Sequence, residues 1–437
     1  MKTIRAGLLA LITFTASAQA EIAIQPVTSP GGINAWLVEE SAFPFTALEI
    51  RFRGGMSIDP VEQRGVINLM TALIDDGAGD LDAESFANAR DALAAKFNFD
   101  ASDDNISVSA RFLTEDRDEA IDLLRLALTE PRFDADAIER ARGQVLSRIQ
   151  SDQKDPDTIA GDLLDRMAFG THPYGSSGMG TAQSVAALTR ADLQAAFGSA
   201  MSRDNIYVAA TGDINAEDLG ILLDKLLGDL PATSAPAPER ADWALEGGIT
   251  VVDFPSPLSI VYFEQQGMKR SDPDFFTAYI INEIMGGGRF SARLMTEVRE
   301  KRGLTYGIGS YLVPQNHAEI LLGMFASGND TTAEAIDLVK AEWAKMADNG
   351  ISEEELAMIK TYLTGSFPLQ FDGNAQIARI LVDIQMDDLP LDYVQTRNAK
   401  IEAVTTDDIA RVAKQLLQPE NLHFMVVGQP EGLSTTP

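Results

Sequence analysis

The chain has 437 residues, 45% of them hydrophobic, and its 65 Asp and Glu outnumber 35 Lys and Arg to give a formal net charge of −30. An acidic excess of this size excludes nucleic acid and anionic membrane surfaces as electrostatic partners. It is compatible with cationic peptide ligands, although a soluble acidic exterior explains it as well. The sequence contains no cysteine, which excludes disulfides and thiolate chemistry.

The first 20 residues have the pattern of a secretory signal peptide. Lys2 and Arg5 precede a mostly apolar stretch from Ala6 to Ala16, and Ala18-Gln19-Ala20 fits a small-residue cleavage site. The apolar stretch is too short to span a bilayer, and no later segment approaches a membrane-spanning length. We therefore predict cleavage after Ala20 and a periplasmic protein without a membrane span.

The remaining sequence predicts strands and helices in two successive groups. The first group has strands at 35–39, 46–53 and 106–112 and helices at 61–75, 82–96, 114–128 and 135–151. The second has strands at 249–254, 259–265, 306–313 and 320–326 and helices at 274–285, 332–349 and 352–363. Hairpin-like strands mixed with helix pairs predict an α+β fold of two tandem, structurally related α/β sandwich domains. Each would be a mainly antiparallel sheet with helices packed on it.

The end of the first group and the end of the chain share one pattern. The same intervals separate Thr189, Asn205 and Gly212 and, 216 residues later, Thr405, Asn421 and Gly428. Each Thr is expected to be the N-cap of a helix, with an acidic residue three positions later in a capping box. This register predicts a duplicated domain. The predicted boundaries are a signal peptide at 1–20, a first domain at 21–230, a Pro- and Ala-rich linker at 231–246 and a second domain at 247–437.

The segment most informative about function ends in Arg299 and Tyr306. An Arg-rich, helix-compatible run stops at Gly303 and leads into an alternating strand that carries Tyr306. The two side chains can converge across this glycine turn. Arg has a fixed fork of donors and Tyr a phenolic hydroxyl, which together suit a peptide carbonyl or a carboxylate. On spacing alone, a helix-end charge and a packed strand aromatic explain the pair as well.

Several features together resemble the insulinase/pitrilysin superfamily of zinc metallopeptidases, which includes mitochondrial processing peptidase. They are the tandem domains, the Pro-rich linker and Arg-x6-Tyr preceded by Gly286-Gly287-Gly288-Arg289-Phe290-Ser291. The resemblance covers nearly all of the sequence after residue 20. In active members His-x-x-Glu-His on the first long helix binds zinc and activates a water, and a downstream Glu is the third ligand.

The positions that match the zinc motif hold other residues in this chain. They are Asn68, Thr71 and Ala72, and acidic positions of the downstream helix hold Ala141 and Arg148. The three histidines, His172, His317 and His423, have no second ligand nearby in sequence at metal-binding spacing. The resemblance therefore implies a domain without a metal site of its own.

In the family, one chain can bind zinc while a second chain has lost the motif. The resemblance implies that this chain is the non-zinc subunit of a heterodimeric zinc metalloendopeptidase, inactive alone, with zinc in a homologous partner subunit. Arg299 would hold the backbone of a peptide substrate, and Tyr306 would donate a hydrogen bond to the developing oxyanion in trans. The alternative is a periplasmic peptide-binding or assembly protein with no catalytic role, which export and acidity fit equally well.

Four further features keep two explanations each. Gly286–Gly288 is either a flexible loop near the substrate path or a helix terminator. The segment His172-Pro173-Tyr174-Gly175 resembles a family loop near the central cavity, and a Pro/Gly turn with a surface His explains it equally. The strands at 262–265 and 318–326 either offer an edge to an extended peptide or pair inside a sheet. The cations Arg293, Lys301 and Arg302 are expected to form a solvated or salt-bridged face rather than a substrate clamp.

Overall fold

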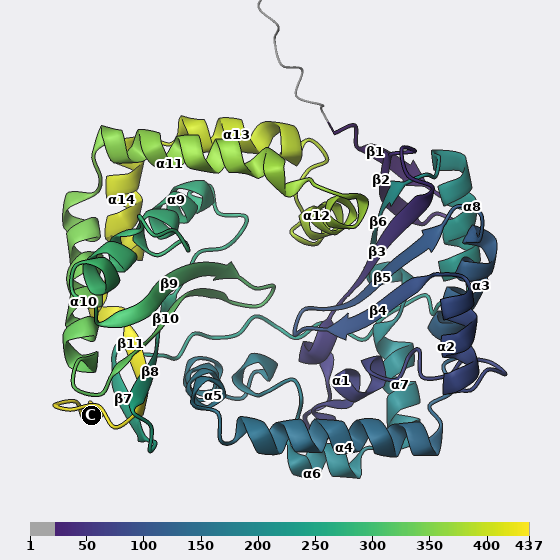
Figure 1. Cartoon of the computed structure of the whole chain (residues 1–437), viewed down its shortest axis with the longest axis horizontal. Helices are drawn as coiled ribbons and strands as arrows, with labels where there is room; N and C mark the ends of the chain where they lie inside the picture. The colour runs from purple at the N-terminus through teal and green to yellow at the C-terminus, as the bar shows by residue number, and fades with distance from the viewer. Residues whose placement is uncertain (1–21, 437) are drawn as a thin grey trace, which may run out of the picture.

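The computed structural model describes residues 22–436, so the predicted signal peptide lies outside the described residues. Eleven strands form two sheets, each with helices packed on it, which confirms the predicted α+β class (Figure 1). The first sheet has the order β1-β2-β6-β3-β5-β4, and the second has the order β7-β11-β8-β10-β9. Between 22 and 436 we find no helix with the length and apolar character needed to cross a membrane.

The strands of the first sheet are β1 (Gln25–Thr28), β2 (Asn34–Glu39), β3 (Phe45–Arg53), β4 (Lys96–Ala101), β5 (Asn105–Leu113) and β6 (Ile206–Gly212). Those of the second are β7 (Gly248–Asp253), β8 (Leu258–Gln266), β9 (Thr305–Pro314), β10 (Glu319–Gly328) and β11 (His423–Gly428). The predicted domain boundaries remain a prediction.

The helices also fall into two sets along the chain. The first set is α1 (Val66–Thr71), α2 (Ala83–Ala92), α3 (Arg117–Thr129), α4 (Ala135–Asp152), α5 (Pro156–Phe169), α6 (Ala182–Ala187), α7 (Arg190–Ala200) and α8 (Ala216–Leu227). The second is α9 (Phe275–Met285), α10 (Thr332–Asn349), α11 (Glu353–Ser366), α12 (Asn374–Met386), α13 (Tyr393–Ala403) and α14 (Thr406–Leu416).

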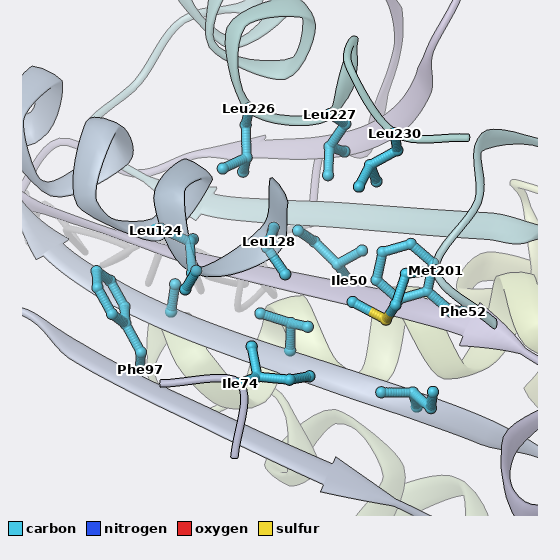
Figure 2. Close-up of a cluster of buried hydrophobic side chains, with 14 of the residues drawn as sticks. Ile50, Phe52, Ile74, Phe97, Leu124, Leu128, Met201, Leu226, Leu227 and Leu230 are labelled. Carbon is cyan, nitrogen blue, oxygen red and sulfur yellow. The ribbon is translucent and has the colours of Figure 1, made fainter. Parts of the chain in front are cut away.

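The first sheet has one apolar and one polar face. Along β5, Ile106 and Val108 are fully buried and alternate with the half-buried Ser107 and Ser109, because successive side chains of a strand point to opposite faces. The apolar face packs against α3 and α8. Figure 2 shows the side chains at this contact, which include Ile50, Phe52, Leu124, Leu128, Leu226 and Leu227.

The duplicated pattern is confirmed in three dimensions. Thr189 and Thr405 each cap a helix in a capping box, with Asp192 and Asp408 as the acidic partners. The strand that follows takes the same place in both sheets. β6 lies parallel to β2 and antiparallel to β3, and β11 lies parallel to β7 and antiparallel to β8.

The two halves exchange one helix each. α12, from the second half, packs across β3 and β6 of the first sheet, where Leu381 shares a hydrophobic cluster with Val38. α5, from the first half, packs across β8 and β11 of the second sheet, where Leu164 shares a cluster with Met425. Both helices lie between the two sheets in Figure 1. Neither helix is among the elements predicted from the sequence.

Two predicted helices of the first half are wrong in extent. The predicted helix 61–75 is a short 3-10 turn at Val61–Gln63 and then only α1. Gly65 interrupts it with a φ of 97°, and a Cβ there would lie 2.5 Å from the Met179 carbonyl oxygen. The predicted helix 82–96 ends at Ala92, and Lys96 already begins β4. The alternation of that strand is too short to compete with the helical pattern before it.

Of the two explanations for the strands at 262–265 and 318–326, the structure supports pairing inside a sheet. These residues belong to β8 and β10, which pair with strands on both sides. The outer strand at this end of the second sheet is β9, which pairs with β10 alone. That strand carries Tyr306.

Candidate functional site

Arg299 lies on a π-helical turn that leads towards the edge strand β9. The turn spans Met295–Glu300, and its wider winding is seen in the hydrogen bond from the Lys301 amide to the Thr296 carbonyl oxygen at 3.0 Å. Such turns are rare and recur at functional sites. The Arg299 guanidinium stands 4.9 Å from the Phe290 ring centroid, and its Nη1 donates to Glu300 at 2.7 Å. Among the described residues its other N–H groups have no hydrogen-bond acceptor, so they are available to a ligand.

Tyr306 is the second residue of β9 and is 93% exposed. Gly303, with a φ of 66°, supplies the turn between Arg299 and this strand, as predicted. Within residues 22–436 the Tyr306 hydroxyl makes no hydrogen bond, and none joins it to Arg299. The structure thus presents a free phenol on an edge strand and a partly free guanidinium on the preceding turn. The Tyr306 hydroxyl and the remaining Arg299 N–H groups are donors without a partner among the described residues.

The glycine run before this element has a packing role. α9 ends at Met285, and the Gly286 carbonyl oxygen accepts from the Ser310 amide of β9 at 2.9 Å. A Cβ at Gly286 would lie 2.5 Å from the Ser310 nitrogen. The glycine therefore allows the end of α9 to approach β9 closely, which supports the helix-termination explanation and places Phe290 beside Arg299.

The neighbouring cations are salt-bridged, as predicted. Arg293 pairs with Glu355 at 2.7 Å, and Lys301 and Arg302 pair with Glu297 at 2.6 and 3.0 Å. The Glu297 pKa is lowered by its hydrogen bonds to these two side chains. These three cations therefore have internal partners, in contrast to most of the Arg299 guanidinium.

The positions that match the zinc motif do not fit a zinc ion. Asn68 is half-buried on α1, Thr71 is buried with an Oγ1 that has no hydrogen-bond partner, and Ala72 offers no donor atom. On α4, Ala141 packs in the core and Arg148 pairs with Asp152 at 2.8 Å. Zinc requires His, Cys or carboxylate ligands. In the region 22–436 no group of three such side chains is arranged to hold a metal.

The structure brings His172 and His317 together at the joint between the halves, which their distance in sequence did not suggest. Their ring centroids lie 6.0 Å apart, and Tyr174 contacts both rings. His172 accepts from the Tyr174 amide through Nδ1 at 3.1 Å, so its Nε2 carries the proton donated to the Glu239 carbonyl oxygen at 3.0 Å. Burial lowers the pKa of both imidazoles. His172 therefore ties the linker to a Pro/Gly turn as a half-buried neutral side chain.

Sequence reasoning missed Phe290 and Glu300 as the residues that position Arg299. Phe290 is 66% exposed, which is unusual for a large aromatic side chain. Its position in the quoted glycine motif was the only signal, and the contact depends on how α9 ends. A guanidinium over an aromatic ring gains about 0.5–1 kcal/mol at an exposed site. The pair therefore restricts Arg299 only weakly.

Comparison with known proteins identifies the family. Residues 37–182 match the model of insulinase (peptidase family M16), and residues 187–363 match that of the peptidase M16 inactive domain. A non-peptidase homolog, YmxG, of Helicobacter pylori is 26% identical over 89% of this chain and 90% of its own length. A probable mitochondrial-processing peptidase subunit beta of Schizosaccharomyces pombe is 26% identical over 72% of this chain and 71% of its own length.

A solved structure has the same fold over nearly the whole chain. The crystal structure of a peptidase M16 inactive domain from Pseudomonas fluorescens superposes with a TM-score of 0.88 at 28% identity, and the match covers 95% of this chain and 99% of that one. Together with the two family models, this likeness confirms the resemblance found in the sequence. The chain belongs to peptidase family M16, the insulinase family, as a member whose zinc-motif positions hold no zinc ligands.

Proposed function

We propose that this chain is the zinc-free subunit of a heterodimeric zinc metalloendopeptidase and that it supplies Arg299 and Tyr306 to the partner's active site. The observation that carries the proposal is the 93% exposure of Tyr306 on an edge strand. Tyrosine normally buries most of its ring and finds a partner for its hydroxyl. A free phenol beside a partly free guanidinium suits a surface completed by another molecule.

The first half supports a division of labour between two chains. Asn68, Thr71 and Ala72 cannot replace two histidines and a catalytic glutamate. The similarity to a non-peptidase homolog and to a peptidase named as a subunit favours the same assignment. A homologous chain with an intact His-x-x-Glu-His motif is therefore the proposed partner, and peptides are the proposed substrates.

In the complex, a zinc ion held by the partner would supply the activated water. Tyr306 would donate its hydroxyl proton in a hydrogen bond to the scissile carbonyl oxygen as negative charge develops there. Arg299 would hold a neighbouring carbonyl or carboxylate of the substrate through Nε and Nη2, which make no internal hydrogen bond in the described residues. Losing one oxyanion donor typically costs about 3 kcal/mol at the transition state, or roughly 100-fold in rate.

We also propose that the chain is exported to the periplasm and cleaved after Ala20, since residues 1–20 have the n-region, apolar core and small-residue site of a signal peptide. N-terminal sequencing of the protein purified from its source tests this directly. A mature protein that begins with Glu21 is the expected result, and one that retains Met1 would contradict it.

Activity of the reconstituted pair tests the catalytic proposal. The chain is co-expressed with an exported homologue that has the intact motif, and cleavage of a quenched fluorescent peptide is measured. Tyr306→Phe and Arg299→Ala should each lower kcat/KM about 100-fold while the zinc content of the complex stays the same. Tyr311→Phe, an exposed tyrosine of the same strand, is the matched control and should leave kcat/KM unchanged. Unaltered kcat/KM in both site variants would refute the role.

The same preparation distinguishes the peptidase-subunit role from the alternative, a peptide-binding or assembly role. If the chain binds the peptide with micromolar affinity and no homologous chain confers cleavage, the peptide-binding or assembly role replaces the peptidase subunit. If cleavage appears only with both chains present, the subunit assignment stands.

A further inference from the structure

A cavity of about 840 Å³ opens on the polar face of the first sheet, at the edge strand β4. Four cationic side chains line it, and each comes from a different element: Arg90 from α2, Lys96 from β4, Arg111 from β5 and Arg379 from α12. The exchanged helix α12 covers the neighbouring strands β3 and β6 and forms one wall. The second half thus contributes to the cavity through α12, which supplies Ala375 and Arg379.

Three of these cations pair with no carboxylate in the described residues, and the Arg111 guanidinium stands 5.3 Å from the Phe45 ring centroid. Arg90 pairs with Asp75 at 3.2 Å and with Asp91 at 3.4 Å. Lys96, Arg111 and Arg379 form neither an ion pair within 4.0 Å nor a side-chain hydrogen bond with any residue from 22 to 436. In contrast, most arginines of the described chain pair with a carboxylate. The sequence has 65 acidic and 35 basic residues, so basic side chains are expected to find carboxylate partners. Three cations without such a partner around one cavity run against this expectation.

The buried carboxylate in the wall does not neutralise these cations. Glu49, which is 2% exposed, uses its Oε2 to accept from Arg51 Nη1 at 2.8 Å and from Ser109 Oγ at 2.8 Å. Its charge is therefore already compensated by Arg51, which lies on the same strand. The other acidic lining residue, Asp91, pairs with Arg90 at 3.4 Å, so the lining keeps three cations without a carboxylate partner in a chain with a strong acidic excess.

The remaining lining suits a peptide chain. Asn98 and Ser109 offer polar side chains that can hydrogen-bond to a peptide backbone. Ala375, in the first turn of α12, also lines the cavity, and that turn has no side-chain cap. Uncapped N–H groups give a helix start a partial positive charge, which adds to the cationic lining.

We propose that this cavity binds an acidic peptide segment, with the arginine forks of Arg111 and Arg379 and the ammonium of Lys96 holding its carboxylates. Arginine matches the planar geometry of a carboxylate with two parallel hydrogen bonds. The face of the first sheet that carries α12 is turned towards the second half (Figure 1). The proposal involves neither zinc nor a partner subunit, so it stands apart from the peptidase assignment.

Fluorescence anisotropy on the chain purified without residues 1–20 tests the proposal. The probes are a fluorescein-labelled decapeptide with four glutamates and its counterpart with four glutamines. The glutamate peptide should bind at least tenfold more tightly, and its affinity should fall as salt rises. The double variant Arg111→Gln/Arg379→Gln should lose at least tenfold in affinity for the glutamate peptide. Lys96→Gln, which keeps both arginines, should also bind the glutamate peptide more weakly than the parent does.

The matched control removes the same charge from another place. Arg203 and Lys414 are exposed and likewise unpaired within the described chain, and Arg203→Gln/Lys414→Gln should bind the glutamate peptide as the parent does. An equal loss in this control would show an effect of net charge and would overturn the site. Equal affinity for the two peptides would overturn the carboxylate role. Displacement of the peptide by free glutarate at equimolar concentration would assign the cavity to small dicarboxylates and overturn the peptide proposal.

Discussion

Glu264 is a carboxyl group buried without a partner, and its replacement by glutamine should stabilise the protein at neutral and alkaline pH. The side chain lies on β8, is 2% exposed, and its Oε1 has no hydrogen-bond partner in the described structure. Burial raises the Glu264 pKa from 4.5 to about 8, and the Asp165 carboxylate of α5 adds to the rise. Burial also raises the pKa of Asp165, to about 7. His423, opposite Glu264 on β11, has a pKa lowered by burial and offers no compensating charge at neutral pH.

The direction of this pH dependence follows from the number of protons bound in the folded and unfolded states. Between the unfolded pKa of 4.5 and the folded value of about 8, the folded state binds more protons than the unfolded state. The free energy of unfolding therefore falls as the pH rises through this window. At 1.36 kcal/mol per pKa unit, the full loss above pH 8 is at most about 5 kcal/mol. Glutamine has nearly the size and polarity of the protonated carboxyl group, so Glu264→Gln should match the parent near pH 4.5 and exceed it by up to that amount above pH 8.

Urea unfolding followed by circular dichroism, at intervals from pH 4.5 to 8.5, measures this difference. Because other groups titrate in the same pH window, only the difference in free energy of unfolding between Glu264→Gln and the parent reports on Glu264. Glu319→Gln is a control for which the opposite change in stability is expected. Glu319 is buried but pairs with Arg240 at 2.6 Å, so its loss should destabilise the protein at neutral pH by leaving that cation unpaired. Parallel curves for Glu264→Gln and the parent from pH 4.5 to 8.5 would refute the reasoning.

Three other outcomes are expected. Leu381→Ala should lower the free energy of unfolding by about 2–5 kcal/mol in urea titrations, because this fully buried side chain joins α12 to the first sheet. Gly286→Ala should lower Tm through its clash with Ser310, whereas Gly143→Ala, where a Cβ in α4 meets nothing within 4 Å, should stabilise by about 0.5–1 kcal/mol. Metal analysis after chelation and reloading with zinc should find less than one zinc per isolated chain, and one per chain would contradict the poor fit of Asn68 and its neighbours.

The parts of the fold that sequence predicted well are those set by neighbouring residues. The capping boxes at Thr189 and Thr405 depend on a threonine and an acidic residue three positions apart, and both formed. The turn at Gly303 depends on one residue that adopts positive φ at low cost. The helix predicted at 61–75 failed because its start is decided by a distant contact. A Cβ at residue 65 would lie 2.5 Å from the Met179 carbonyl oxygen, a close approach that no local pattern reveals.

The candidate site could be predicted from neighbouring residues, whereas the cationic cavity depends on contacts between segments that are distant in sequence. Arg299 and Tyr306 lie on one continuous turn and strand, so a sequence motif could point to both, although their exposure depends on β9 being the outer strand. Periodicity shows which face of an element is apolar, but not which element will cover it. The pattern of β5 marks Ser109 and Arg111 simply as residues of its polar face. Only the crossing of α12 from the other half places Arg379 at the same cavity and changes that face from a solvated surface to the wall of a binding site.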